Sequence, residues 1–318
     1  MDSKKIIPVD FSRLKRGPLG DKKHKVTLDR QAGKPVAGAT LEEFCRALPG
    51  VLAADAFRSV VEALVEATRD GRDVVLACGA HVIKCGLSPL LNELMQRKLV
   101  SLIALNGAGA IHDAELAMVG STSEDVMTVV KDGSFGMARE TGAFYGRAVE
   151  MGTTMQMGLG EALGMTLIQD QAPYCSDSVL AQAVATGTPI TVHCAIGTDT
   201  VHTFPEVDPS GLGALTHYDF RLFCGCVNGF EPGTVYLNVG SAVILPEVFL
   251  KAVGVAKNMG RSLEGLTRVN MDMIQHYRPR ENVLGRINPD ENHRCYALTG
   301  HHEIMLPLLV WSWLNGIS

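Results

Sequence analysis

Hydrophobic positions along the chain alternate between helix-like and strand-like spacing. Between residues 57 and 65 the apolar side chains recur every three or four positions, which predicts an amphipathic helix with one buried stripe. The continuous apolar run at 74–78 predicts a strand buried on both faces. A helix at 90–97 and a second strand at 102–105 complete a strand–helix–strand unit, which is typical of a parallel sheet.

The same alternation continues to the end of the chain. It predicts helices at 179–185, 219–227, 246–257 and 302–313, and strands at 189–192, 234–237 and 296–298. The segment 258–294 is polar and contains two prolines, so we expect an insertion over the sheet edge there. Because no shift in composition marks a linker, residues 36–318 are expected to form a single doubly wound α/β domain with a mostly parallel sheet.

Residues 1–35 differ from the rest. They are rich in lysine and arginine, contain scattered prolines and show no hydrophobic period. We expect an extended arm that is solvated, or docked on its own domain or on a neighbouring subunit. After the arm, Thr40 and Glu43 have the spacing of a capping box, which predicts a helix start.

Composition narrows the class of protein. A chain of 318 residues with 46% hydrophobic and 20% charged residues is globular rather than disordered. The net charge of -5 gives no reason to expect nucleic acid or anionic lipid as a partner. No apolar run reaches membrane-spanning length, and the first residues do not resemble a secretory signal. The eight cysteines are therefore expected to be reduced thiols in a cytoplasm.

The chain contains 33 glycines, and several of them lie in turns that follow predicted strands. Ligands bind beyond the carboxyl ends of the strands in open parallel sheets, and glycine lets a backbone approach a ligand closely. Two adjacent glycine-rich loops there predict a nucleotide site, with candidate residues Gly79, Ala80, His81, Gly86, Gly107, Ala108, Gly109 and Asp113. Neither loop is the strict dinucleotide fingerprint, and each is also compatible with an ordinary tight turn.

Two later loops add polar side chains. The first carries Thr198, Asp199 and His202 after the strand that ends near His193. Asp199 is a candidate for catalysis or ligand contact, and His202 suits proton transfer near neutral pH. The second loop places Gly240 and Ser241 before a helix, where capping is the expected role of the serine.

Histidines elsewhere leave other hypotheses open. A metal-dependent hydrolase using His193, His202 and His112 is one alternative, although the spacing matches no compact metal template. The adjacent His301 and His302 point in different directions on a helix, so the sequence predicts that one of them faces the cleft rather than that both bind one metal. No metal ligand is therefore assigned.

The order and spacing of these loops resemble the deoxyhypusine synthase family. The resemblance rests on Ala80–Gly86, Asn106–Asp113, Thr198–Asp199 and Gly233–Gly240, and covers roughly residues 55 to 255. It implies a Rossmann-like, deoxyhypusine-synthase-like NAD-binding domain in a homotetramer. It also implies that NAD oxidises a polyamine and that an enzyme lysine forms an imine with the aminobutyl group.

One departure changes the expected chemistry. Val243 occupies the position of the imine-forming lysine, and a valine cannot form a Schiff base. We therefore expect a homologue that binds NAD or a related nucleotide and a small amine, with Asp199, His202 and His112 as catalytic candidates, but that does not make deoxyhypusine. The alternative from another class is a catalytically silent binding or assembly protein.

Overall fold

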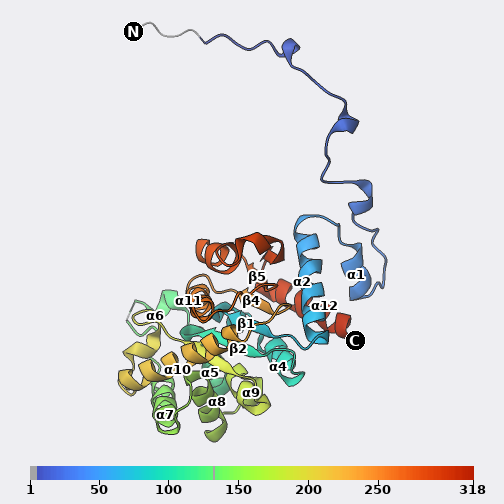
Figure 1. The fold of residues 1–318 in the computed structure, drawn as a ribbon. Coiled ribbons are helices and arrows are strands. Elements are labelled where there is room, and N and C mark those ends of the chain that lie inside the picture. The colour runs from blue at the N-terminus through green and yellow to red at the C-terminus, as the bar shows by residue number, and fades with distance from the viewer. Residues whose placement is uncertain (1–5, 132) are drawn as a thin grey trace, which may run out of the picture.

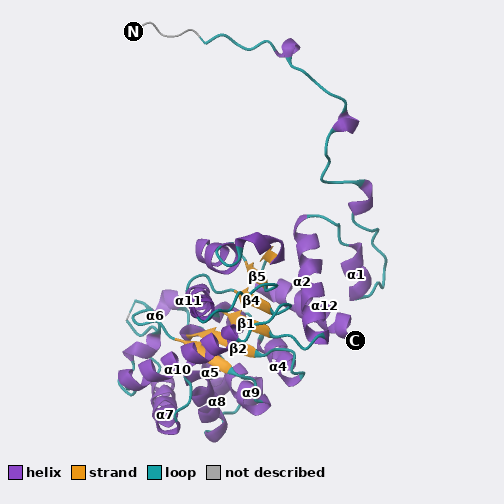
Figure 2. Ribbon diagram, in the orientation of Figure 1, coloured by secondary structure: helices purple, strands orange, loops and turns teal. Residues whose placement is uncertain are grey.

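A six-stranded, fully parallel sheet forms the centre of the computed structural model, which describes residues 6–131 and 133–318 (Figures 1 and 2). Its strands run in the order β3-β2-β1-β4-β5-β6. This is the strand order of a Rossmann fold, in which the chain reverses direction across the sheet between β1 and β4. The strands are β1 (Val74–Cys78), β2 (Leu102–Asn106), β3 (Ile190–His193), β4 (Val235–Val239), β5 (Thr267–Asp272) and β6 (Cys295–Thr299).

Helices cover both faces of the sheet, and strand side chains alternate between two cores. In β1, Val74, Leu76 and Cys78 join the larger core, whereas Val75 and Ala77 join the smaller one. The larger core contains α2 (Leu52–Arg69), α4 (Ser88–Gln96), α5 (Gly107–Val119), α7 (Arg139–Met155), α8 (Leu159–Gln169), α9 (Val179–Thr186) and α12 (His302–Ile317). The smaller core lies under α10 (Pro209–Asn228) and α11 (Ile244–Asn258). The short helices are α1 (Leu41–Ala47), α3 (Ala80–Lys84) and α6 (Val126–Val129).

The doubly wound parallel α/β prediction is confirmed, and so is the Thr40–Glu43 capping box at the start of α1. The interpretation of 258–294 as an insertion is wrong, because this segment contains β5, which pairs with β4 and β6. The hydrophobic pattern does not predict β5, because several of its side chains are polar. Arg268 is fully buried there and donates hydrogen bonds to carbonyls of Leu284, Ile287 and Asn288.

The amino-terminal arm extends away from the folded body (Figure 1). Residues 6–29 are exposed throughout and contain only short 3₁₀ turns. Residues 1–5 of the predicted arm lie outside the described residues. The body begins where Arg30 accepts a hydrogen bond from Gly50 and pairs with Asp55. Residues 6–29 therefore do not dock on the rest of the described chain.

Two further sequence expectations concern the membrane and the cysteines. None of the helices in the described ranges combines the length and apolarity needed to cross a bilayer. All eight cysteines are free thiols, as expected.

A buried carboxylate joins three elements on one side of the sheet. Asp219 of α10 is fully buried, and its Oδ2 accepts hydrogen bonds from the amides of Val192 (2.7 Å) and Gly160 (2.9 Å). These bonds fix α10 to β3 and to the first turn of α8. Burial raises the pKa of Asp219 to about 7, although the amide hydrogen bonds act in the opposite direction.

We expect Asp219→Asn to change how stability depends on pH. The raised pKa means that Asp219 favours folding fully below its unfolded pKa near 3.8, and that this contribution is lost as pH rises towards about 7. The free energy of unfolding of the wild type, relative to Asp219→Asn, should therefore fall by up to about 4 kcal/mol between pH ~4 and ~8.

Urea unfolding across this pH range measures the difference. Asp70→Asn, at the exposed C-cap of α2, is the matched control and should show no such trend. A constant difference between the wild type and Asp219→Asn would show that Asp219 is ionised in the folded protein throughout.

Candidate functional site

Two glycine turns meet at the point where the strand order reverses. The amide of Gly79, after β1, donates to the carbonyl of Val239 at the end of β4 (2.8 Å). A methyl group on Gly79 would overlap the carbonyl of Gly240. Gly240 itself has a φ of +68°, and a Cβ there would lie 2.5 Å from Nε2 of His302. Gly79 is therefore required for these backbones to touch, and Gly240 is required for its left-handed backbone and for the packing of His302.

The turn after β1 leads into an uncapped helix start. Gly79 is the N-cap of α3, and no side chain accepts hydrogen bonds from the first amides at Ala80 and His81. Gly86 has a φ of +72° and ends this helix, so it lies at the opposite end from the turn. Across the crevice, Oγ of Ser241 accepts a hydrogen bond from the amide of Leu245 in the first turn of α11 (3.2 Å).

The turn after β2 is already occupied by the chain's own side chains. Oδ1 of Asn106 accepts a hydrogen bond from the amide of Gly109 (3.0 Å), and Asp199 accepts one from the amide of Ala108. A Cβ on Gly107 would lie 2.6 Å from Oδ2 of Asp199. The predicted candidates Gly107, Ala108 and Gly109 thus lie against the chain's own side chains, because the carboxylate of Asp199 lies at the start of α5.

Asp113 is also placed differently from the prediction. It is fully buried, and its carboxylate accepts hydrogen bonds from Oγ of Ser178 and from the amides of Val179 and Leu180. It therefore caps α9 from within the core and does not face the crevice. Burial raises its pKa, and these three hydrogen bonds act against that rise.

A cavity of about 180 Å³ opens beyond the ends of β2 and β3. It brings together the predicted residues Ala108, His112, Thr198 and Asp199. Its other lining residues were not singled out from the sequence: Ile111, Glu115, Ser123, Glu124, Phe135, Gly136, Thr200 and Phe204. Glu124 also accepts a hydrogen bond from the amide of Gly136 (3.1 Å), so these two lining residues are held together.

An acid–base cluster lies on the α5 wall of this cavity. Nδ1 of His112 lies 2.7 Å from Oγ1 of Thr122, which donates a hydrogen bond to Glu115. Burial acts to raise the pKa of Glu115, but the hydrogen bonds from His112 and Thr122 outweigh it and hold that pKa below its ordinary value. Glu115 is therefore a carboxylate that keeps His112 in place. The signal for it was its position three residues after His112 on a helix.

Asp199 faces the cluster from the β3 side. Its Oδ2 accepts a hydrogen bond from the amide of Ala195 (2.7 Å), and the carboxyl is half-buried. Burial raises the pKa of Asp199, whereas the amide bonds and nearby His202 lower it. His202 does not line the cavity, and its buried Nε2 has no hydrogen-bond partner among the described residues.

The predicted metal site of His193, His202 and His112 is not formed. His193 is buried, bonds Thr191 (3.0 Å) and packs edge-on against Phe223 of α10, in the direction of the smaller core. Burial lowers its pKa to about 3, so it is a neutral core histidine. His112 lies on α5, which belongs to the larger core on the other face of the sheet. The metal-dependent hydrolase hypothesis is therefore wrong for these residues.

Comparison with known proteins supports the fold and not a specific activity. No protein-family model matches the chain, and no curated protein sequence does. Among solved structures, ArgZ, an arginine dihydrolase of the cyanobacterial ornithine–ammonia cycle, is 17% identical with a TM-score of 0.51, covering 81% of this chain and 32% of its own. AgrE in complex with ornithine and NAD⁺ is 17% identical with a TM-score of 0.52, covering 85% and 34%.

A candidate deoxyhypusine synthase from Entamoeba histolytica is 11% identical with a TM-score of 0.51, covering 87% of this chain and 94% of its own. The chain thus spans about a third of the length of the ArgZ and AgrE chains that it matches. At these identities the similarities establish a Rossmann-like fold that also occurs in NAD-binding proteins. They agree with the sequence resemblance at the level of the fold.

We expect Gly107→Ala to destabilise the protein only while Asp199 is present. The new methyl group would collide with the Asp199 carboxyl, and overpacking of this kind costs about 1–3 kcal/mol. In an Asp199→Ala background the same substitution should cost much less, which gives a favourable coupling energy in a double-mutant cycle. Urea unfolding of the four proteins measures it.

Gly213→Ala is the matched control, because a Cβ at that position in α10 meets nothing within 4 Å. It should be neutral or stabilise by up to about 1 kcal/mol. Additive effects of Gly107→Ala and Asp199→Ala would mean that Asp199 does not pack on the start of α5.

Proposed function

We propose that the chain binds a small aliphatic amine in the cavity beyond β2 and β3, and acts on it with NAD or a related nucleotide bound at the neighbouring turns. One observation supports the amine above all others. Glu115, Glu124 and Asp199 line the cavity together with His112, and the lining contains no lysine or arginine among the described residues. Carboxylates in a partly buried cavity attract a cation more strongly than they would in water.

The apolar lining favours an alkyl amine over a compact inorganic cation. Ile111 and Phe204 are mostly buried, and Phe135 is partly exposed at the rim. These side chains provide a surface for methylene groups, while the carboxylates hold ammonium ends. A cavity of about 180 Å³ suits a short chain of this kind, such as one end of a polyamine.

His112 is the residue best placed for proton transfer in this cavity. Thr122 and Glu115 hold its ring, and both His112 and Glu115 line the cavity. An amine must lose a proton before its nitrogen can share a lone pair, and a neutral imidazole can accept it. Asp199 holds the cation in place, while His202 lies behind it without contact with the cavity.

A nucleotide fits the β1 and β4 turns better than the β2 turn. The first amides of α3 at Ala80 and His81 have no side-chain cap, and backbone amides at a helix start bind phosphate. The β2 turn is filled by Asn106 and Asp199, and a phosphate there would face a carboxylate. NAD would supply a hydride acceptor. AgrE, one of the structural neighbours, forms a complex with ornithine and NAD⁺.

The covalent route of the resembled family is not part of this proposal. Val243 is the N-cap of α11 and offers no amine, and Lys251 on the same helix pairs with Glu247 (3.2 Å). Reaction on this chain is therefore limited to steps that need no lysine imine. Assembly as a homotetramer and a cytoplasmic location are further expectations carried by the sequence and its resemblance alone.

We expect spermidine to bind to the purified chain and to bind at least about tenfold more weakly to Glu115→Gln and to Asp199→Asn. Each substitution removes one charge-assisted contact, which contributes about 1.5–3 kcal/mol. Isothermal titration calorimetry measures both affinities. Glu66→Gln, on the exposed face of α2, changes the net charge equally and should leave the affinity unchanged.

Succinate, a small aliphatic molecule of opposite charge, should not bind. Equal affinity of spermidine for the wild type, Glu115→Gln and Asp199→Asn would show that attraction is non-specific and would overturn the amine proposal. Spermidine binding without any NAD reduction would instead identify the chain as a silent binding protein.

We expect NAD to raise the melting temperature of the wild type and not that of Ala80→Asp. Ligand at about 100 times its dissociation constant adds about 2.7 kcal/mol of stability. An aspartate in the first turn of α3 repels a phosphate, while its effect on the helix itself is favourable. Thermal melting with and without NAD measures the shift.

Ala53→Asp, in the exposed first turn of α2, is the matched control and should retain the NAD shift. An equal shift in Ala80→Asp would show that the nucleotide does not bind at α3. If NAD did not raise the melting temperature of the wild type, NAD would be ruled out as the cofactor. The proposal that an amine binds in the cavity would not be affected.

A further inference from the structure

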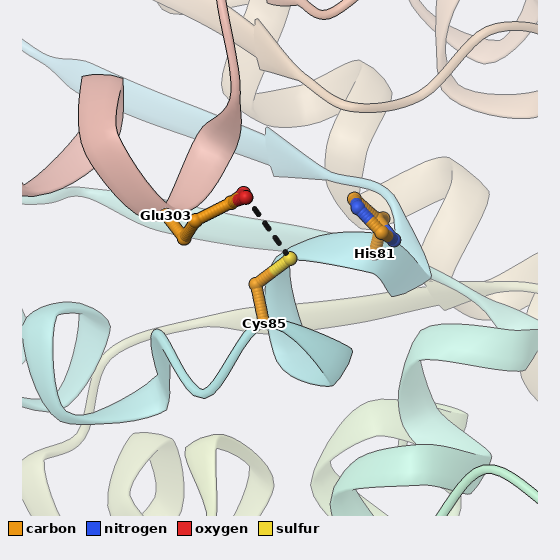
Figure 3. A group of neighbouring side chains, drawn as sticks. All are labelled: His81, Cys85 and Glu303. Atoms are coloured by element: carbon orange, nitrogen blue, oxygen red, sulfur yellow. Dashed lines mark hydrogen bonds between the residues drawn. The ribbon is translucent and has the colours of Figure 1, made fainter.

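A compact group of three potential metal ligands lies beside the β1 turn, outside the amine cavity. His81 and Cys85 come from α3 and its C-cap, and Glu303 comes from the first turn of α12 (Figure 3). One ligand atom from each lies within 4.8 Å of the other two. Sγ of Cys85 and Oε2 of Glu303 are 3.7 Å apart. The two helices thus bring together a nitrogen, a sulfur and an oxygen donor.

The spacing along α3 supports joint ligation. His81 and Cys85 are separated by four residues, so they lie on the same face of one helical turn. Donor atoms around a tetrahedral zinc ion are about 3.3–3.8 Å apart, given bonds of about 2.0–2.3 Å. The observed separations reach this range with small side-chain rotations, because His81 and Cys85 are only partly buried and Glu303 is exposed.

A second, independent observation concerns His302. It is fully buried, and neither of its ring nitrogens has a hydrogen-bond partner among the described residues. Its ring meets that of His81 edge-on, with the centroids 5.6 Å apart. A buried polar group without a partner is costly and calls for an unseen ligand or water. His302 thus places a buried imidazole without a described partner next to His81, with its Nε2 on the side of Gly240.

We propose that His81, Cys85 and Glu303 bind one divalent transition-metal ion of the zinc class at the junction of α3 and α12. Imidazole, thiolate and carboxylate are the donors that zinc takes in proteins, and three protein ligands leave a fourth position for water. The ion would fix the start of α12 to α3 next to the β1–β4 crevice. The site shares no residue with the amine cavity, so it does not depend on the amine proposal. His81 also lies in the turn assigned to the nucleotide, whereas Cys85 and Glu303 do not.

The test uses the full chain, stripped of metal with a chelator and titrated with Co²⁺ as a spectroscopic probe. We expect one equivalent of Co²⁺ to produce a thiolate-to-metal charge-transfer band in the near ultraviolet, and Zn²⁺ to displace it. Cys85→Ser should abolish the band. His81→Asn and Glu303→Gln should weaken Zn²⁺ binding by more than the 10–100-fold that loss of an outer-shell partner typically costs.

Cys175→Ser is the matched control, because Cys175 is also a partly buried free thiol but lies outside the cluster. It should retain the band at full intensity. Circular dichroism confirms that each variant is folded before titration. Absence of a thiolate band at one equivalent of Co²⁺, or a band that persists in Cys85→Ser, would overturn the proposal.

Discussion

The close contact between the turns after β1 and β4 is the constraint on which the rest of the site depends. Gly79 and Gly240 touch through their backbones, which is possible only because Gly79 carries no side chain. This contact fixes where α3 begins. It also leaves room for the imidazole of His302 to pack directly on Gly240. The helix starts, the crevice and the His81–Cys85–Glu303 cluster thus all take their positions from two residues without a Cβ.

The sequence predicted the sheet where strands are apolar and failed where they are not. The run at 74–78 matches β1 residue for residue, because a strand covered on both faces must be apolar throughout. The hydrophobic pattern does not predict β5, because the strand contains the polar residues Arg268 and Asn270. Both are buried, and their hydrogen-bond partners are brought together only by folding. At the site, the positions of His112 and Asp199 after predicted strands are enough to predict them as candidates, and both line the cavity. The role of Asp113 as an internal cap depends on α9, a contact that no local pattern reveals.

Asp199 divides the crevice into two parts of different chemistry. Its carboxylate lies where a Rossmann-type helix commonly presents amides to a phosphate, and it is held there by the amides of Ala195 and Ala108. The β2 side of the crevice consequently carries negative charge from the protein itself. The β1 and β4 side keeps its free amides at α3. One side chain therefore separates a part of this sheet edge that carries carboxylates from a part that presents backbone amides.

The exposed arm has a consequence for how the chain can vary. Residues 6–29 carry apolar side chains such as Ile6, Ile7 and Phe11, each more than 70% exposed, and the folded body makes no use of them. At about 3.3–3.6 Å per residue, such a segment reaches well beyond the surface from which it departs. Substitutions in this exposed segment therefore have no packing cost in the folded body, and any structural constraint on its apolar side chains must come from contacts beyond that body.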